Sequence, residues 1–467
     1  MLMRPDASSA GLTSRLSTFA AVARLSDLEP AARRVATMQA LDGIACILAG
    51  STSPRVAKSL ELAQTLEGRV EAANAVPVIG TGLRGGVASA AYAVAAACHA
   101  LEYDDGNREG SVHPGAAVVP AALAVGYRNN ASLGEVIDAI MGGYEICVTA
   151  AEIMNPQAMR RGFQLTPVAG VLGAAGAAGR LLGLDAQRME RALGLAGSAS
   201  SGTFAYLAGG GDVKKLHPAH AARCGVHAAF AEATELAVGP RAVLEGPRGL
   251  LFAFAGLGPE NAERPVGGER PAICRSYLKP YPCCRHVHSA IEALASIVAE
   301  QQVGAKEIAG IEVETYAAAM AHAPLAWDTF EIAQLSFPYL MAVTATHGTV
   351  GLAHFDARHR EDAELAALAG RTQIREAEDL SASYPAESPA RVRLRTKDGR
   401  TFEAASRHPP GAPEAPLTDD AFANKFSECA RLAPRLADPD GLLDHLMSAA
   451  PDTPLRRIVD ESLVPPS

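Results

Sequence analysis

This chain of 467 residues has few aromatic side chains, few basic residues for its acidic ones and no long apolar run. Each of these features argues against a class of structure or partner. Aromatic side chains make up only 5% of the sequence, so few large rings are available to pack between helices. The formal net charge of -9 disfavours a nucleic-acid partner, because phosphate binding needs a basic surface. No apolar run is long enough and free enough of charge, glycine and proline to predict a membrane span.

The eight cysteines are mostly isolated in apolar runs, which is typical of reduced cysteines in a core and not of a disulfide framework. Residues 1–30 contain no apolar segment followed by a cleavage-like site, so we expect no secretory signal. These features predict a cytoplasmic protein. The length predicts roughly two to four domains.

Some stretches contain the residue types of cofactor sites, but their spacing does not fit. The segment "GVLGAAGAAG" (170–179) lacks the G-x-G of a dinucleotide-binding turn. In "CCRHVH" (283–288), adjacent cysteines converge poorly on one ion, and no second ligand pair follows. We therefore predict neither a metal nor an organic cofactor. A nucleophilic Cys283 or Cys284 stays open, since neighbouring basic residues favour a thiolate.

The first half of the chain has the pattern of consecutive helices. Residues 30–50 place apolar side chains at helical spacing and end at a glycine. Further helical segments, rich in alanine and glycine, are predicted over residues 115–129, 133–154, 170–184 and 189–202. Because small side chains let helix axes approach closely, we expect tight helix packing here.

The pattern changes after about residue 265. Residues 307–316 alternate like a half-buried strand, and residues 390–405 predict a hairpin around Asp398 and Gly399. From about residue 416 the helical pattern returns. The sequence thus predicts a mainly α protein. A large helical domain is formed by residues 1–265 and 405–467, and a smaller α+β domain by residues 266–404.

Charged and imidazole side chains gather in three loops. "LEYDDGNREGSVHPG" (101–115) follows an alanine-rich helix and carries several carboxylates before His113. Lys214 lies in the glycine-rich segment "GGGDVKKLHP", and Lys279 lies in the proline-rich segment "RSYLKPYPCCRH". Lysines in such segments, beside histidine, suit the binding of a carboxylate anion.

Six segments in order resemble the MmgE/PrpD family, which includes 2-methylcitrate dehydratase, cis-aconitate decarboxylase and iminodisuccinate epimerase. They are "HALEYDDGNREGSVHPGAAVVPAALAVG", "GFQLTPVAGVLGAAGAAGRLLGLD", "GDVKKLHPAHAARCGVHAA", "LEGPRGLLFAFAG", "KPYPCCRHVHSAIEA" and "AQLSFPYLMAVTA". The resemblance implies a large helical domain with a smaller α+β lid, a homodimer, and catalysis without metal or organic cofactor. It implies a small di- or tricarboxylic acid as substrate.

Matching the family's motifs to this sequence yields a set of candidate site residues. We assign catalytic roles to His113, Lys214, Lys279, Tyr339 and Glu102, and substrate-binding roles to Asp104, Gly106, Gln164, Cys284 and Arg285. Three of these depart from the decarboxylase branch of the family. Glu102 stands where that branch has Asp, Gly106 where it has Thr, and Gln164 where it has His.

The chemistry that these residues support is proton transfer at a carbon next to a carboxylate. His113 is our candidate for the general base, because its ordinary pKa lies nearest the working pH. A desolvated lysine is the alternative base. Glu102 or Asp104 would orient His113, and Tyr339 would donate a proton. We expect a lyase that dehydrates or decarboxylates its substrate. The alternatives are an epimerase of a substituted dicarboxylate and a carboxylate-binding protein without activity.

Overall fold

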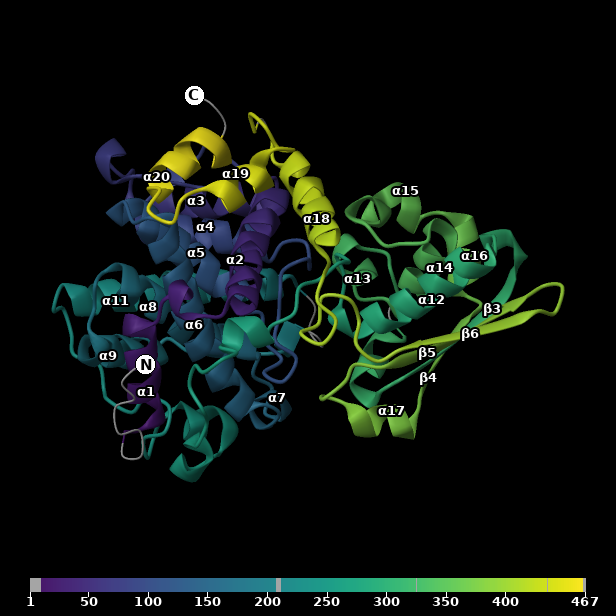
Figure 1. Ribbon diagram of the computed structural model, residues 1–467, viewed down its shortest axis with the longest axis horizontal. Coiled ribbons are helices and arrows are strands. Elements are labelled where there is room, and N and C mark those ends of the chain that lie inside the picture. Colours follow the sequence, from purple (N-terminus) through teal and green to yellow (C-terminus); the bar gives the residue numbers. More distant parts are fainter. Residues whose placement is uncertain (1–9, 207–210, 325, 435, 465–467) are drawn as a thin grey trace. The chain divides into compact units, whose positions relative to one another are not determined.

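The structure of this chain is a computed structural model that describes residues 10–206, 211–324, 326–434 and 436–464 (Figure 1). Its contacts divide the chain into two compact units. The helical unit comprises Met1–Ala100, Asp104–Ser276 and Asp419–Ser467, and the mixed unit comprises Leu101–Tyr103 and Tyr277–Thr418. Both long boundaries fall later in the chain than the predicted ones after residues 265 and 404.

The helical unit draws its helices from both ends of the chain. They are α1 (Leu12–Val22), α2 (Pro30–Gly50), α3 (Pro54–Glu67), α4 (Val87–Cys98), α5 (Gly115–Asn129), α6 (Leu133–Met154), α7 (Gln157–Arg160), α8 (Leu165–Leu181), α9 (Ala186–Gly197), α11 (His217–Ala233), α18 (Asp419–Leu432), α19 (Leu442–Ser448) and α20 (Leu455–Ile458). Two short antiparallel strands, β1 (Val76–Pro77) and β2 (Arg84–Gly85), pair beside them. The helices predicted over residues 30–50, 115–129 and 133–154 are confirmed at both ends.

Glycine allows the central helices of this unit to pack backbone against backbone. A Cβ atom at Gly143 of α6 would lie 2.7 Å from the carbonyl oxygen of Gly173 in α8. A Cβ atom at Gly225 of α11 would likewise lie 2.7 Å from the carbonyl oxygen of Val171. No side chain fits at such distances, so the axes of α6, α8 and α11 approach closely. The small-residue bias of the sequence therefore has the packing role expected of it.

A buried ion pair fixes the C-terminal helix α18 to the N-terminal half of the unit. The Nζ of Lys425 lies 2.5 Å from Oδ1 of Asp42 on α2, and the two side chains are 2% and 1% exposed. Two charges withdrawn from water in this way depend on each other. The sequence separates the partners by most of its length, and their contact closes the helical unit.

The mixed unit combines a sheet with helices. Its elements are α12 (His288–Gln301), β3 (Ile308–Thr315), α13 (Phe330–Ala333), α14 (Phe337–His347), α15 (Ala357–Arg360), α16 (Ala363–Ala369), β4 (Thr372–Glu376), α17 (Glu378–Ser383), β5 (Ala390–Thr396) and β6 (Thr401–Ser406). The strand order is β4-β3-β5-β6, with β3 and β4 parallel and the other neighbours antiparallel. The predicted strand near 307–316 and the hairpin are confirmed.

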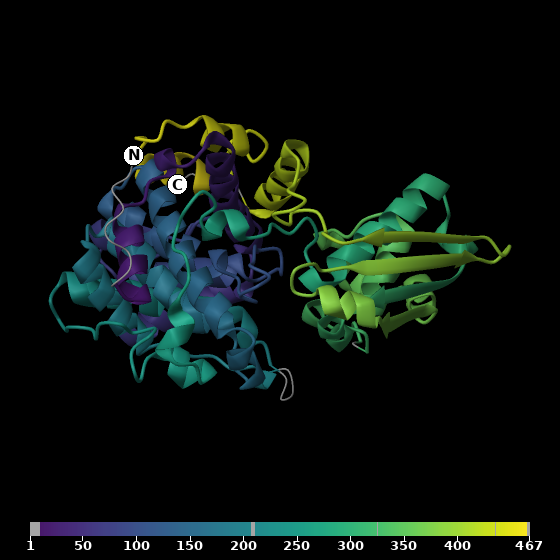
Figure 2. The same cartoon turned by 60° about the horizontal axis from the view of Figure 1, so that its bottom comes forward.

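One face of this sheet packs on helices and the other carries charge. Along β5, Val392 and Leu394 are buried, whereas Arg391 and Arg393 point outward and pair with glutamates of β3 and β6. Figure 2 shows the strands side by side with helices behind them. Alternation of apolar and charged residues along the strands therefore fixes which face is covered.

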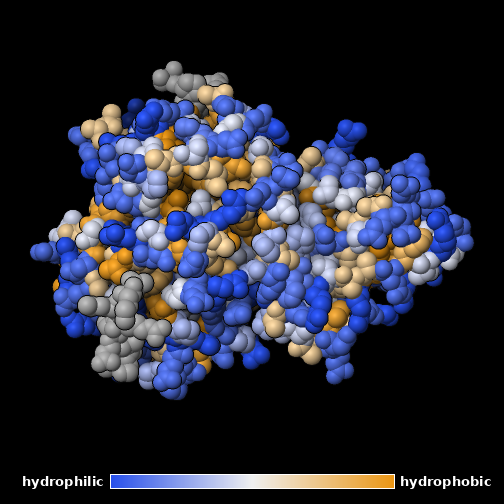
Figure 3. All heavy atoms as spheres, in the orientation of Figure 1, coloured by the Kyte–Doolittle hydropathy of each residue, from blue (hydrophilic) through white to orange (hydrophobic). Residues whose placement is uncertain are grey.

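Hydrophilic residues cover most of the face of the molecule in Figure 3, with hydrophobic residues between them in small groups. Among the described residues, no single helix is both long and apolar enough to cross a membrane; only the bent pair α2 and α3 meets both conditions together. All eight cysteines are free thiols, and six of them are buried, as expected for reduced core cysteines.

Replacing Lys425 with methionine should destabilise the helical unit by about 3–5 kcal/mol, because the Asp42 carboxylate would stay buried without its partner. The matched control is Lys306→Met, whose ion pair with Glu364 has side chains that are 83% and 77% exposed. The control should leave the Tm nearly unchanged. Thermal and urea unfolding measure both effects. Equal stability of the two variants would contradict the anchoring role of Lys425.

Candidate active site

Three helices of the helical unit begin at residues singled out in the sequence. α5 starts directly after His113 and Pro114, α8 starts directly after Gln164, and α11 starts at His217. Two contacts tie these starting points together. The His113 amide donates to Oγ1 of Thr166 at 3.2 Å, and Nδ1 of His217 hydrogen-bonds Oε1 of Gln164.

The meeting of these helix starts favours a bound anion. The N-cap residues of the three helices, all within the described chain, form no side-chain cap. Backbone N–H groups of each first turn carry partial positive charge, and the helix dipoles add to it. Apart from the Gly115 amide, which donates to Asp105, these donors are fixed in place by folding and would stabilise a carboxylate beside them.

Asp104 is a buried carboxylate between two imidazoles. Its Oδ2 lies 2.8 Å from Nδ1 of His99 and 3.3 Å from Nδ1 of His113, while its side chain is 1% exposed. Burial alone would raise the pKa of Asp104. The two imidazoles outweigh this effect and hold the pKa well below its usual range. Asp104 is thus a fixed negative charge beside His113.

His113 is held in one orientation by its Nδ1 atom. This nitrogen lies 2.7 Å from the backbone carbonyl oxygen of Asp105, which can only accept a hydrogen bond. The proton of the neutral ring therefore sits on Nδ1, and Nε2 keeps its lone pair. The side chain is 18% exposed, so a reactant can reach it. His113 has the tautomer that a general base needs.

The group formed by His99, Asp104 and His113 also has the composition of a metal site. One ligand atom of each residue lies within 4.8 Å of the others. The short contact between Nδ1 of His99 and Oδ2 of Asp104 is a hydrogen bond, whose proton a metal ion would have to displace. The donor set fits proton handling better than metal coordination. His99 was not among the predicted site residues, because in the sequence it only follows an alanine-rich helix.

Asp105 explains the glycine that follows His113 and Pro114. Its Oδ1 accepts from the Gly115 amide at 3.0 Å, and its Oδ2 accepts from the Tyr144 hydroxyl at 2.8 Å. A Cβ atom on Gly115 would lie 2.6 Å from Oδ1 of Asp105, so only glycine fits. Burial and the nearby Asp104 charge raise the pKa of Asp105 to about 8.

Lys214 lies at the start of α11, near the pair formed by Gln164 and His217. It is half-buried in the 3₁₀ turn Val213–Leu216. Burial lowers the pKa of His217, and the positive charges of His220 and Lys214 add to that effect. His217 is therefore neutral and can donate its Nδ1 proton to the Gln164 amide. Sequence reasoning missed His217, although it lies in the same segment as Lys214.

Lys279 and Glu102 lie together in the mixed unit. The Lys279 ammonium donates to the Glu102 carbonyl at 2.9 Å and lies 3.6 Å from its carboxylate, with 1% of the lysine side chain exposed. Glu102 has a positive φ of 55°, in the left-handed region. Tyr103 and Gln334 also tie residues 101–103 to this unit. Glu102 is thus paired with Lys279, while Asp104 contacts His113.

Tyr339 is a buried residue of α14 whose hydroxyl donates to the carbonyl oxygen of His354. Burial raises its pKa above the ordinary value, so it is a neutral hydroxyl at physiological pH. Its ring stacks on Trp327 with centroids 6.0 Å apart. The structure places this predicted proton donor within the hydrophobic core of the mixed unit.

The segment after Lys279 holds the remaining candidates. Burial raises the pKa of the Cys283 thiol well above its usual value, which opposes a thiolate there. Cys284 is half-buried, with its sulfur 3.3 Å from Nε2 of His322. The Arg285 guanidinium donates to the carbonyl oxygens of Pro409 and Pro410, so it holds two loops of the mixed unit together.

His286 does not supply the positive charge that a neighbouring thiolate would need. Burial lowers its pKa to about 3, and the charges of His322 and Lys279 act in the same direction.

Gly106 is buried in the helical unit, next to the bridge between Asn107 and Val112. Glycine at position 106 supplies no side-chain hydroxyl to the loop.

Comparison with known proteins extends over both units. Residues 14–261 match the MmgE/PrpD N-terminal domain, and residues 281–438 match the MmgE/PrpD C-terminal domain. Cis-aconitate decarboxylase of Aspergillus terreus is 25% identical over 448 residues, which cover 90% of this chain and 89% of the relative. The cis-aconitate decarboxylase-like protein oryM of Aspergillus oryzae is 27% identical over 421 residues, 84% of each chain.

The raised pKa of Asp105 predicts a pH dependence of stability. An unfolded Asp has a pKa of about 3.9, whereas folded Asp105 has one of about 8. Between these values the folded state keeps a proton that the unfolded state has lost. The free energy of unfolding should therefore fall as pH rises from about 4 to about 8.

The variant Asp105→Asn lacks this titration but keeps the shape of the neutral group. Urea unfolding of both proteins at about pH 5 and about pH 8 measures the difference. The wild type should lose more stability than the variant over this interval. Parallel losses in the two proteins would show that Asp105 is already ionised in the folded state.

Proposed function

Because this chain belongs to the MmgE/PrpD family, we propose that it is a lyase acting on a small di- or tricarboxylic acid. The reaction begins with proton transfer at the carbon next to a carboxylate and ends with loss of water or carbon dioxide. One observation carries this proposal: the oriented His113 imidazole lies at a point where three helices begin. The decarboxylase relatives support the lyase class.

The proposed dehydration uses groups of the helical unit. Nε2 of His113 removes the proton, and charge develops on the adjacent carboxylate, which becomes an enolate-like dianion. Lys214 and the helix N-termini stabilise that charge, and Asp104 stabilises the imidazolium. The electron pair of the broken C–H bond then forms the double bond as the hydroxyl group leaves. The His113 imidazolium passes its proton through solvent to the departing oxygen, which leaves as water, and His113 is neutral again.

Typical magnitudes make this set of groups sufficient for catalysis. A positioned acid or base contributes about 10²–10⁴-fold, and each fixed donor to the charged transition state about 10²–10³-fold.

Lys279 and Tyr339 remain predicted catalytic residues, and Glu102, Gly106, Cys284 and Arg285 remain predicted site residues. We further propose a homodimer whose chemistry needs neither a metal nor an organic cofactor.

Gln164 leads us to favour dehydration over decarboxylation of cis-aconitate. Its amide accepts a hydrogen bond from His217 and has no titratable proton, whereas the decarboxylase branch resembled by this sequence carries histidine there. Loss of an acid–base group at this position leaves proton abstraction by His113 intact. A substrate that keeps its carboxylates and loses water matches the remaining groups.

The test is an assay of the purified protein in D₂O against hydroxy-, amino- and unsaturated di- and tricarboxylates. Alkene absorbance, carbon dioxide release and deuterium incorporation are followed together. A new alkene chromophore supports dehydration, and carbon dioxide release supports decarboxylation. Deuterium exchange without net product would replace the lyase with an epimerase. Binding of a carboxylate without exchange or product would indicate a protein without activity.

Replacement of His113 tests the assignment of the base. His113→Ala should lower kcat by about 10²–10⁴-fold, because the proton acceptor is removed. The variant should stay folded, because His99 still pairs the buried Asp104 carboxylate at 2.8 Å, and the unfolding temperature measured alongside kcat verifies this. His445→Ala, at an exposed position of α19, is the matched control and should keep full activity. Full activity in His113→Ala would remove this histidine from the mechanism.

A further inference from the structure

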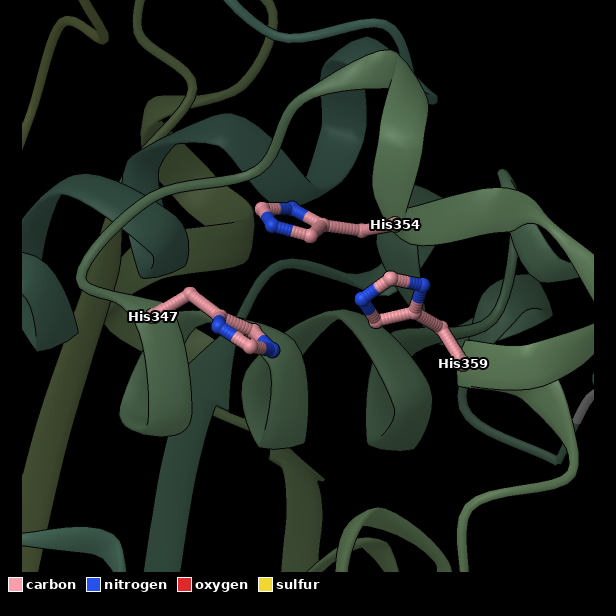
Figure 4. A group of neighbouring side chains, drawn as sticks. All are labelled: His347, His354 and His359. Atoms are coloured by element: carbon pink, nitrogen blue, oxygen red, sulfur yellow. The ribbon is translucent and has the colours of Figure 1, made fainter.

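Three histidines of the mixed unit, none of them used in the proposed chemistry, face a common space (Figure 4). His347 is the last residue of α14, His354 lies in the 3₁₀ turn Leu352–Phe355, and His359 lies in α15. One ligand nitrogen of each lies within 4.8 Å of the other two. The turn between α14 and α15 thus brings three imidazoles of one chain segment together.

His359 is oriented as metal-binding histidines are. Its Nδ1 lies 2.8 Å from Oδ1 of Asp356, and the same oxygen accepts the backbone N–H of His359 at 2.9 Å. This oxygen already accepts the backbone N–H, so it acts as an acceptor toward the imidazole as well. Nδ1 of His359 therefore carries the proton, and Nε2 presents a lone pair. A carboxylate behind the ring is the usual outer partner of a metal-bound histidine.

The other two rings are close enough to complete a site. His347 and His354 stack with centroids 4.5 Å apart, and His359 stands edge-on to both at 5.7 and 5.4 Å. His347 is exposed, and His354 and His359 are half-buried, so the group is open to solvent.

We propose that His347, His354 and His359 bind one divalent transition-metal ion, with Zn²⁺ as the representative ion. Three imidazoles with a fourth position left to water form a common coordination set for Zn²⁺, and imidazole also suits Cu²⁺ and Ni²⁺. The C-terminus of α14, which ends at His347, carries partial negative charge and favours a cation. Asp356 adds a full negative charge beside the site.

Binding requires one local change. Nδ1 of His354 accepts a hydrogen bond from the Gly351 amide at 3.0 Å, so the proton of this neutral ring sits on Nε2. Coordination through Nε2 needs the other tautomer, and the Gly351 hydrogen bond must then break. The segment between α14 and α15 should rearrange when metal binds. The hydroxyl of Tyr339 donates to the His354 carbonyl, so this change would reach a predicted catalytic residue.

The test measures Zn²⁺ binding to the full, metal-stripped chain after removal of any affinity tag. Isothermal titration should show one Zn²⁺ per chain. His347→Ala and His359→Ala should each weaken binding at least about tenfold, and Asp356→Asn should weaken it about 10–100-fold. His347 is exposed, so its variant is expected to keep the fold, which the metal-free unfolding temperature verifies.

Two control variants separate this site from other histidines. His445→Ala, exposed on α19, should bind Zn²⁺ like the wild type. His113→Ala should also keep full binding, because His99, Asp104 and His113 form a separate group. Absence of stoichiometric binding to the wild type would overturn the proposal. Binding that survives both His347→Ala and His359→Ala, or that disappears only in His113→Ala, would overturn it as well.

Discussion

The burial of Asp104 between His99 and His113 is the interaction on which the candidate site depends. A carboxylate withdrawn from water is costly unless it is paired and hydrogen-bonded. Here the partners come from the end of α4 and from the residues before α5, so the loop joining these helices has to close around the charge. The same closure directs Nδ1 of His113 toward the Asp105 carbonyl oxygen and leaves the side chain 18% exposed.

The composition of the sequence supports this arrangement through helix packing. Helices bearing glycine at their contacts approach until backbone meets backbone, as Gly143 and Gly173 do. Close axes place the starts of α5, α8 and α11 near one another, where Thr166 and Gln164 connect them. The electrostatic character of the site therefore follows from small residues buried well behind it. A few larger side chains at these contacts would separate the helix starts.

Local composition and alternation predicted the longer elements well. The helices over residues 115–129 and 133–154 were predicted from runs rich in alanine and glycine, and the hairpin formed by β5 and β6 from its alternating residues around a turn. Strand β4 was not predicted, because it has only five residues and Ile374 is its only strongly apolar side chain. Elements with many buried residues can thus be predicted from local sequence, whereas a short and mostly exposed strand cannot.

The site was only partly predictable, because its contacts join distant segments. His113 and Lys214 stood out by their loops, but nothing in the sequence pairs Gln164 with His217. Sequence reasoning also left Glu102 and Asp104 as alternative partners of His113. The positive φ of Glu102 is one feature of this turn that no periodicity reveals, and Glu102 pairs with Lys279 instead.

The cluster of three histidines between α14 and α15 was not predicted from the sequence, for a related reason. His347, His354 and His359 follow no spacing that identifies a metal site, and only the fold of the intervening turn brings them together.

The tautomer of His113 is the property that most directly tests the proposed base. Nitrogen NMR of the protein with ¹⁵N-labelled histidine, recorded at about pH 8, distinguishes a protonated ring nitrogen from one with a lone pair. The geometry predicts a proton on Nδ1 and a lone pair on Nε2, because Nδ1 faces the Asp105 carbonyl. The reverse tautomer, with the proton on Nε2, would contradict this and leave His113 unable to act as the base.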